Sequence, residues 1–181
     1  MKFIIIIAFS ILFSLTACLS LPTNERITLE NGSVTFEIPA GFNKLSAEEI
    51  SLVSNNDDAP SFTFANDNRT ASVSCDIKGT GMPPGMPSEA ELPDVLQEMA
   101  QTWDNMLPGI EWIKKEIIDI NGRKFILFEI AANAKDKDFH NISMFAFYQE
   151  KMFMLNLNSS KNAFQDFESD FWRCIQTVVI K

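Results

Sequence analysis

The chain has 181 residues, with 15 Lys and Arg against 24 Asp and Glu, which gives a formal net charge of −9. An acidic surface repels nucleic-acid phosphates and anionic lipid headgroups, so we expect no nucleic-acid partner. The length suits one domain with one core, and the 16 phenylalanines, which carry no polar group, are expected to fill most of it.

The N-terminus has the pattern of an export signal. Lys2 supplies a positive charge, and residues 3–13 are apolar except for Ser10. This run is shorter than the roughly 20 residues that a membrane-spanning helix needs, but it has the length of a signal-peptide core. The alternatives are a plain secretory signal and an N-terminal membrane helix.

Leu15, Thr16, Ala17 and Cys18 follow directly, and this Leu-x-Ala-Cys pattern resembles the lipobox of bacterial lipoproteins. The resemblance implies that residues 1–17 are a removed signal peptide and that Cys18 carries the lipid, a diacylglycerol on sulfur and a further acyl chain such as palmitate on the amine. Two or three chains give lasting attachment, because each buried methylene contributes about 0.8 kcal/mol. Leu19 in place of Asp implies the outer membrane, facing the periplasm. Residues 18–25 would then be a lipidated tether and residues 26–181 one globular domain.

The first half of that domain reads as two hairpins and a short helix. Residues 26–29 and 33–38 flank Asn31-Gly32, which favours a type I′ turn. Ser46 and Glu49 form a capping box that opens a helix toward Val53. Residues 61–65 and 70–77 are predicted as the second hairpin.

The segment 79–87 is predicted to be an exposed loop, because three glycines and three prolines fall within it. Met82, Pro83, Pro84 and Met86 are candidates for contact with a partner, since exposed methionine and proline make an adaptable surface. The alternative is that the methionines fold back onto the core.

The second half is predicted to hold a long helix, four strands and a closing helix. Ser88 caps the long helix, which runs to about Leu107 with apolar residues at helical spacing. The later segments are strands 110–120, 123–132, 139–149 and 152–158, joined by turns at Asn121-Gly122, 134–138 and Glu150-Lys151, then helix 162–175 and a closing strand 177–180. This order predicts an α+β fold, an antiparallel β-sheet flanked by helices.

Three segments carry a resemblance to a known family. They are Val34-Thr35-Phe36-Glu37-Ile38-Pro39-Ala40-Gly41-Phe42, Asn121-Gly122-Arg123-Lys124-Phe125, and Phe164-Gln165-Asp166-Phe167 continuing to Ile175. Together they resemble the PsbP/Mog1-like fold, which includes small bacterial lipoproteins similar to DcrB. The resemblance implies an α/β sandwich and binding or accessory roles without a shared active site, so it carries over no functional residue.

Residues for catalysis or for metal binding are scarce. His140 is the one histidine, and at the head of a strand it is expected to be an ordinary surface-edge side chain. A hydrolytic triad and a catalytic zinc site both need more than this chain offers. Asp57-Asp58 and the pair Asp136 and Asp138 could bind calcium but read better as solvated turns. We therefore expect no enzyme activity, no metal and no cofactor.

Two cysteines besides Cys18 are predicted to face the core. Cys75 alternates with Val73 and Ile77, and Cys174 lies in the apolar stripe of the last helix. An oxidising periplasm would allow a Cys75–Cys174 disulfide, and two free buried thiols are the alternative. A structural zinc held by these thiols and His140 is a remote third reading.

Three functions fit these observations. The first is a membrane-tethered, non-enzymatic module of the cell envelope that binds or supports another protein. The second is an immunity protein whose acidic surface neutralises a basic toxin. The third is an envelope hydrolase that works through paired carboxylates.

Overall fold

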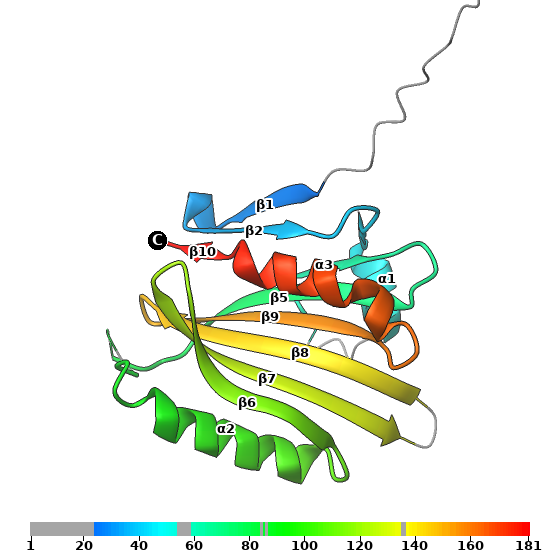
Figure 1. The fold of residues 1–181 in the computed structure, drawn as a ribbon. Coiled ribbons are helices and arrows are strands. Elements are labelled where there is room, and N and C mark those ends of the chain that lie inside the picture. The colour runs from blue at the N-terminus through cyan, green and yellow to red at the C-terminus, as the bar shows by residue number, and fades with distance from the viewer. Residues whose placement is uncertain (1–23, 54–58, 84, 86, 135–136) are drawn as a thin grey trace, which may run out of the picture.

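The computed structural model describes residues 24–53, 59–83, 85, 87–134 and 137–181. Two antiparallel sheets and three helices make up this part of the chain (Figure 1). In chain order the elements are β1 (Glu25–Leu29), η1 (Glu30–Gly32), β2 (Val34–Ile38), β3 (Asn43–Lys44), α1 (Ala47–Val53), β4 (Phe62–Ala65), β5 (Ala71–Gly79), α2 (Leu92–Met106), β6 (Glu111–Ile120), β7 (Arg123–Ala134), β8 (Lys137–Tyr148), β9 (Lys151–Ser160), α3 (Phe164–Gln176) and β10 (Val179–Ile180).

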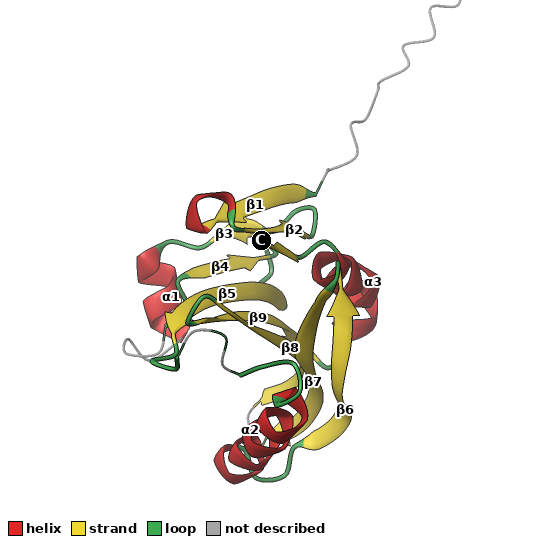
Figure 2. Cartoon of the chain, turned by 90° about the vertical axis from the view of Figure 1, so that its left-hand side faces the viewer, coloured by secondary structure: helices red, strands yellow, loops and turns green. Residues whose placement is uncertain are grey.

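The larger sheet has seven strands in the order β3-β4-β5-β9-β8-β7-β6, and the smaller has three in the order β1-β2-β10. Helix α3 and the small sheet cover one face of the large sheet, and α2 covers the other (Figures 1 and 2). The predicted α+β class is confirmed. The strands divide into two antiparallel sheets, because the first hairpin pairs with β10 at the end of the chain and not with the large sheet.

The main core lies between the large sheet, α3 and the small sheet. Strand β2 buries alternate residues toward it, and Phe36 meets Phe153 of β9 with ring centroids 6.4 Å apart. Phe42 packs edge-on against Phe167 and Phe171 of α3. Every phenylalanine within the described ranges is buried or half-buried, as their number led us to expect.

Helix α2 closes a second, smaller core on the opposite face. Leu92, Leu96 and Ala100 are buried against β7 and β8. Trp103 stacks on Trp112 with ring centroids 6.1 Å apart, and the Trp112 Nε1–H donates to Asp104 Oδ1 at 2.7 Å. These tryptophans thus serve packing.

The two Asn-Gly turns form as predicted. Asn31 and Gly32 have φ of 55° and 92°, and Asn121 and Gly122 have φ of 52° and 80°. Asn and Gly adopt this left-handed region at the least cost. The Asn121 side chain also donates to the carbonyls of Gln176 and Val178, so this turn ties the end of α3 to the large sheet.

Other predicted boundaries were wrong by a few residues. The β8–β9 turn lies at Gln149-Glu150 and not at Glu150-Lys151, because Tyr148 pairs with Lys151. The strands around the charged turn 134–138 run to Ala134 and resume at Lys137. Of the two predicted helix starts, the Ser46–Glu49 capping box forms in both directions. Ser88 instead bonds Glu91 ahead of α2, which begins at Leu92 next to a proline.

Within the described ranges, no helix is both long enough and apolar enough to cross a membrane. The signal peptide 1–17, Cys18 and most of the tether lie outside those ranges.

Candidate functional site

The segment from Gly79, the last residue of β5, to Glu91, just before α2, is called the 79–91 loop, and it begins beside the β8–β9 hairpin. The backbone N–H and the side-chain hydroxyl of Thr80 both donate to the Glu150 carbonyl, at 2.9 and 3.0 Å. At the far end of the loop the Ser88 N–H donates to Glu91 Oε2 at 2.7 Å. The Thr80 contacts thus fix the start of the loop to the hairpin, whereas the Ser88–Glu91 bond is a local contact among the last residues before α2.

The predicted partner-contact residues lie on the middle of this loop. Met82 is 42 % exposed and Pro83 is exposed, so the alternative that Met82 folds back onto the core is wrong. Pro84 and Met86 lie outside the described residues. Whether a partner binds at this loop stays a prediction.

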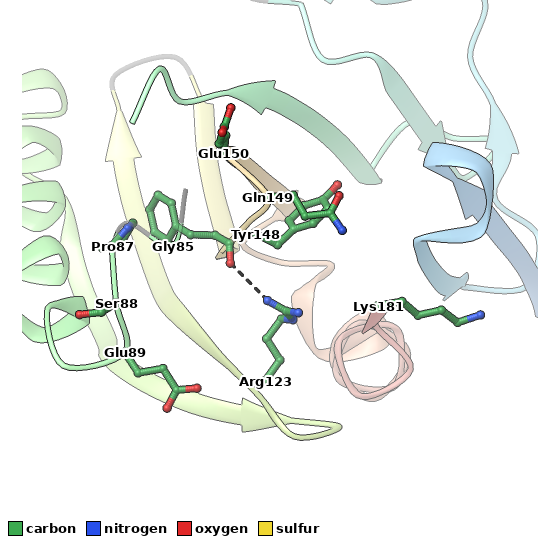
Figure 3. A pocket seen from close by; sticks show the side chains of 10 residues that line it. Gly85, Pro87, Ser88, Glu89, Arg123, Tyr148, Gln149, Glu150 and Lys181 are labelled. Carbon is green, nitrogen blue, oxygen red and sulfur yellow. Dashed lines mark hydrogen bonds between the residues drawn. The ribbon is translucent and has the colours of Figure 1, made fainter. Parts of the chain in front are cut away.

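Between the loop and the hairpin is a hollow of about 400 Å³ (Figure 3). Its lining comes from three parts of the chain: Gly85, Pro87, Ser88 and Glu89 of the loop, Arg123, Phe147, Tyr148, Gln149 and Glu150 of the large sheet, and Lys181 at the end of the small sheet. Residues far apart in the sequence thus meet at one end of the molecule.

Arg123, the first residue of β7, points its guanidinium into this hollow (Figure 3). One nitrogen, Nη1, donates to the Phe147 carbonyl at 3.2 Å, whereas Nε is buried and makes no hydrogen bond. A buried donor left without an acceptor costs about 1–3 kcal/mol. Within the described part of the chain each other arginine has a carboxylate partner, in the pairs Arg26–Glu37, Arg69–Glu49 and Arg173–Asp170.

Tyr148, the one tyrosine of the chain, is also part of the lining of the hollow. Its side chain is 7 % exposed, and its hydroxyl is buried without a hydrogen-bond partner. Burial raises the pKa of this phenol, and the charge of Glu30 raises it further. The group therefore stays protonated in neutral solution and can donate a hydrogen bond.

The hairpin turn at the rim has an unusual backbone. Gln149 and Glu150 have φ of 46° and 63°, a region that residues with a side chain rarely adopt. The Thr80 contacts to the Glu150 carbonyl hold this turn. Such strain persists only where the surroundings enforce it, and it is often found at functional positions.

Two carboxylates, Glu89 and Glu150, also line the hollow, and both are exposed. Figure 3 shows them on opposite sides with their carboxylates pointing apart. Paired carboxylates that cleave a glycosidic bond must face each other across the substrate. This arrangement gives no support to the hydrolase hypothesis.

A buried ionic cluster lies farther along β7 and β8, toward the middle of their pairing. The expectation that His140 is a surface-edge residue was wrong: it is 8 % exposed, and its Nε2 lies 2.9 Å from Glu129 Oε1. Its ring stacks on Phe164 with centroids 3.4 Å apart. Lys114 Nζ lies 3.1 Å from Glu129 Oε2 and above the ring of Trp172.

The sequence carried one signal for this cluster that our reading missed. Glu129 interrupts the apolar run of β7 at a core-facing position, and a buried charge needs a partner. His140 lies deeper in the sheet than predicted because β8 begins at Lys137. For Arg123 and Tyr148 there was no comparable signal, since each ends a strand next to a turn.

Both described cysteines are buried and free, and they belong to the same core. The Cys75–Cys174 disulfide is therefore absent from the structure, which has the alternative of two free thiols. Burial raises the pKa of both thiols. Among the described residues no three His, Cys, Asp or Glu side chains are grouped so as to hold a metal, and His140 bonds Glu129 instead of the thiols. The calcium candidates Asp57, Asp58 and Asp136 lie outside the described residues.

Comparison with known proteins shows the fold. No family model matches the chain, and no curated protein matches it. Among solved structures, the cyanobacterial PsbP protein CyanoP of Synechocystis has a TM-score of 0.64 at 16% identity, over 91% of this chain and 96% of that one. LpqN of Mycobacterium tuberculosis, described as involved in cell envelope biogenesis, has a TM-score of 0.56 at 12% identity, over 88% and 91%. A protein of unknown function from Pseudomonas aeruginosa has a TM-score of 0.50 at 14% identity, over 87% and 97%.

At such identities the likeness shows the fold alone. The PsbP-like fold that the sequence resembled is confirmed, and none of these three proteins is described as an enzyme.

Proposed function

We propose that this chain is a lipid-anchored protein of the cell envelope whose domain is a non-enzymatic accessory module, and that it binds a partner protein at the 79–91 loop. The observation that carries the proposal is the loop itself. Its described residues Met82 and Pro83 are exposed, and the two hydrogen bonds from Thr80 to the Glu150 carbonyl fix the start of the loop to the β8–β9 hairpin. A segment that is already fixed at one end loses less conformational entropy on binding than a free loop does.

The position of the proposed anchor agrees with this role. Six residues separate Cys18 from β1 at Glu25, which span at most about 20 Å when extended. The described chain enters β1 at one end of the molecule, and the 79–91 loop lies at the opposite end (Figure 1). A domain tethered through Cys18 would present this loop to the aqueous side, away from the lipid.

The similarity in fold to known proteins supports the general class of function but no particular partner. LpqN is described as a protein of cell envelope biogenesis and CyanoP as a PsbP protein, and both share the architecture of this chain. An accessory role in the envelope fits the lipobox resemblance, which no structural observation bears on.

Site-specific photocrosslinking in cells tests the partner surface. A photoreactive residue at Met82 is expected to crosslink one discrete partner. The same residue at Glu168, which is exposed on α3, serves as the matched control and is expected to give none. Equal crosslinking from both positions, or none from Met82, would overturn the proposed surface.

Cell fractionation tests the anchor separately. The Cys18→Ser variant is expected to keep its signal peptide, and so to run at a larger size, or to leave the membrane fraction. Unchanged size together with unchanged membrane association contradicts lipid attachment at Cys18.

A further inference from the structure

The guanidinium of Arg123 is an anion-binding group without an anion partner within the described chain. It donates once, from Nη1 to the Phe147 carbonyl, and its buried Nε has no acceptor. The chain has 24 acidic side chains, and each of its other arginines pairs with one of them. Figure 3 shows the Arg123 head between Pro87 and Ser88 of the loop, Tyr148 and Lys181, among the residues that line the hollow.

A second donor borders the same hollow. The Tyr148 hydroxyl is buried and unpartnered, and Tyr148 as a whole is 7 % exposed. Arg123 and Tyr148 both line the hollow, and each has a buried donor that lacks an acceptor. An acceptor with two oxygens that enters the hollow and reaches these donors would give each the hydrogen bond it lacks.

The surroundings select the kind of anion. A planar carboxylate matches the flat edge of a guanidinium and accepts two parallel hydrogen bonds. Glu89 and Glu150 offset the positive charges of Arg123 and Lys181 in the lining, so the hollow is formally neutral and suits a monoanionic carboxylate better than a dianionic phosphate. Pro87 and Phe147 supply apolar wall, and the volume of about 400 Å³ lies in the range of roughly 300–1,000 Å³ that is usual for small-ligand sites.

We propose that this hollow binds a carboxylate attached to an apolar group, with Arg123 as its charged anchor and Tyr148 as its second donor. Two sources share that chemistry, a free aromatic or aliphatic acid and the C-terminal carboxylate of a peptide with an apolar last residue. The hollow shares the 79–91 loop with the proposed partner surface, since Gly85, Pro87, Ser88 and Glu89 line it, but Met82 does not. Its test measures binding of a small acid to the purified protein, so the result is separate from the crosslinking at Met82.

Calorimetric titration of the full-length protein purified in detergent tests the site. The probes are hippurate, its neutral methyl ester, a tripeptide ending in Phe, the same peptide amidated, and phenyl phosphate. Hippurate or the free-acid peptide is expected to bind at least about tenfold more tightly than its neutral counterpart, because the charge-assisted pair with Arg123 is lost in the ester and the amide. The tighter of the two acids identifies the source.

Variants assign the residues. Arg123→Met is expected to lower the affinity at least about tenfold, Arg123→Lys to lower it less because a point charge remains, and Tyr148→Phe to lower it severalfold without loss of the ring. Lys124→Met is the matched control. It removes one positive charge from the next residue, which pairs with Asp119 and lies outside the hollow, so the affinity should not change.

Four results would overturn the proposal. They are equal binding of acid and ester, unchanged affinity of a folded Arg123→Met, tighter binding of phenyl phosphate than of hippurate, and no binding of either acid. The comparison of acid with ester on the unaltered protein decides the matter even if Arg123→Met does not fold.

Discussion

Buried polar groups lie at two places along the β7–β8 pair, and the two groups differ in how well they are satisfied. In the middle of the pair, Glu129 Oε1 bonds His140, and Glu129 Oε2 makes no hydrogen bond but lies 3.1 Å from Lys114 Nζ; Phe164 and Trp172 cover this group. At one end, Arg123 and Tyr148 each keep a buried donor without an acceptor, next to a hollow. The carboxylate of the first group, the closed cluster, has an ion partner within the fold, whereas the guanidinium of the second, the open group, has none.

The difference separates a group that holds the fold from one suited to a ligand. A buried charge with its partners is costly to disrupt, because removing one member leaves the others buried and alone. A donor that has no partner in the folded protein adds little to stability and can be removed cheaply. The predictions below test this contrast, from the largest effect to the smallest.

Removal of the Glu129 carboxylate should have the largest effect. Glu129→Ala leaves His140 buried without its partner, and we expect a loss of about 3 kcal/mol in the free energy of unfolding, measured by urea denaturation. Glu116→Ala, at an exposed position on β6, is the control and should change it by less than about 0.5 kcal/mol. A loss below about 1 kcal/mol for Glu129→Ala would mean that the closed cluster does not hold the fold.

A hydroxyl group placed in the core without a hydrogen-bond partner should lower the free energy of unfolding by less than Glu129→Ala does. Cys75 is 1 % exposed and lies in register between Phe62 and Leu155. Cys75→Ser places a hydroxyl there without an acceptor and should lower the free energy of unfolding by about 2 kcal/mol. Cys75→Ala controls for lost volume and should cost about 1 kcal/mol. If Cys75→Ser and Cys75→Ala lower the free energy of unfolding equally, the polarity of the serine hydroxyl has no effect at this position.

Loss of the Arg123 guanidinium should matter little for stability. Arg123→Met keeps the apolar stem and removes the unsatisfied donors, so the free energy of unfolding should change by less than about 1 kcal/mol. Urea denaturation beside Glu129→Ala gives the comparison directly. A loss as large as that of Glu129→Ala would assign Arg123 to the fold and not to a ligand.

The smallest effect concerns an exposed contact among the last residues of the 79–91 loop, between Ser88 and Glu91. Hydrogen bonds from the hydroxyl and the backbone N–H of Ser88 lower the pKa of Glu91 below its usual 4.5. A carboxyl whose pKa is lower in the folded than in the unfolded state contributes stability above the unfolded value, and this contribution is lost as the pH falls through the folded value. Melting curves of Glu91→Gln and the unaltered protein should therefore differ at pH 7 and converge below about pH 4.5.

The control for that titration is Glu98→Gln, which is exposed on α2. This variant removes one exposed carboxylate and leaves the Ser88–Glu91 contact in place. If the melting curves of Glu91→Gln and the unaltered protein still differ in acid, the contact between Ser88 and the Glu91 carboxylate is not the cause of their difference.

Local sequence patterns predicted most of the elements. The alternation of Val34, Phe36 and Ile38 predicted β2, and Asn31-Gly32 and Asn121-Gly122 predicted two hairpin turns, because backbone freedom and side-chain alternation are properties of a few neighbouring residues. The turn at Gln149-Glu150 was misplaced since neither residue favours a left-handed backbone. There the pairing of β8 with β9 and the contacts of Thr80 override local preference.

By itself the sequence determined the α+β class, the resemblance to the PsbP-like fold, the exposed loop with Met82 and the expectation that Cys75 and Cys174 face the core. Only the tertiary structure decided that the first hairpin joins β10 in a second sheet, that His140 is buried against Glu129, and that Arg123 and Tyr148 share a hollow with the loop. The physical reason is distance along the chain. Arg123 and Phe147 are 24 residues apart, and their contact exists only once β7 and β8 have paired in register.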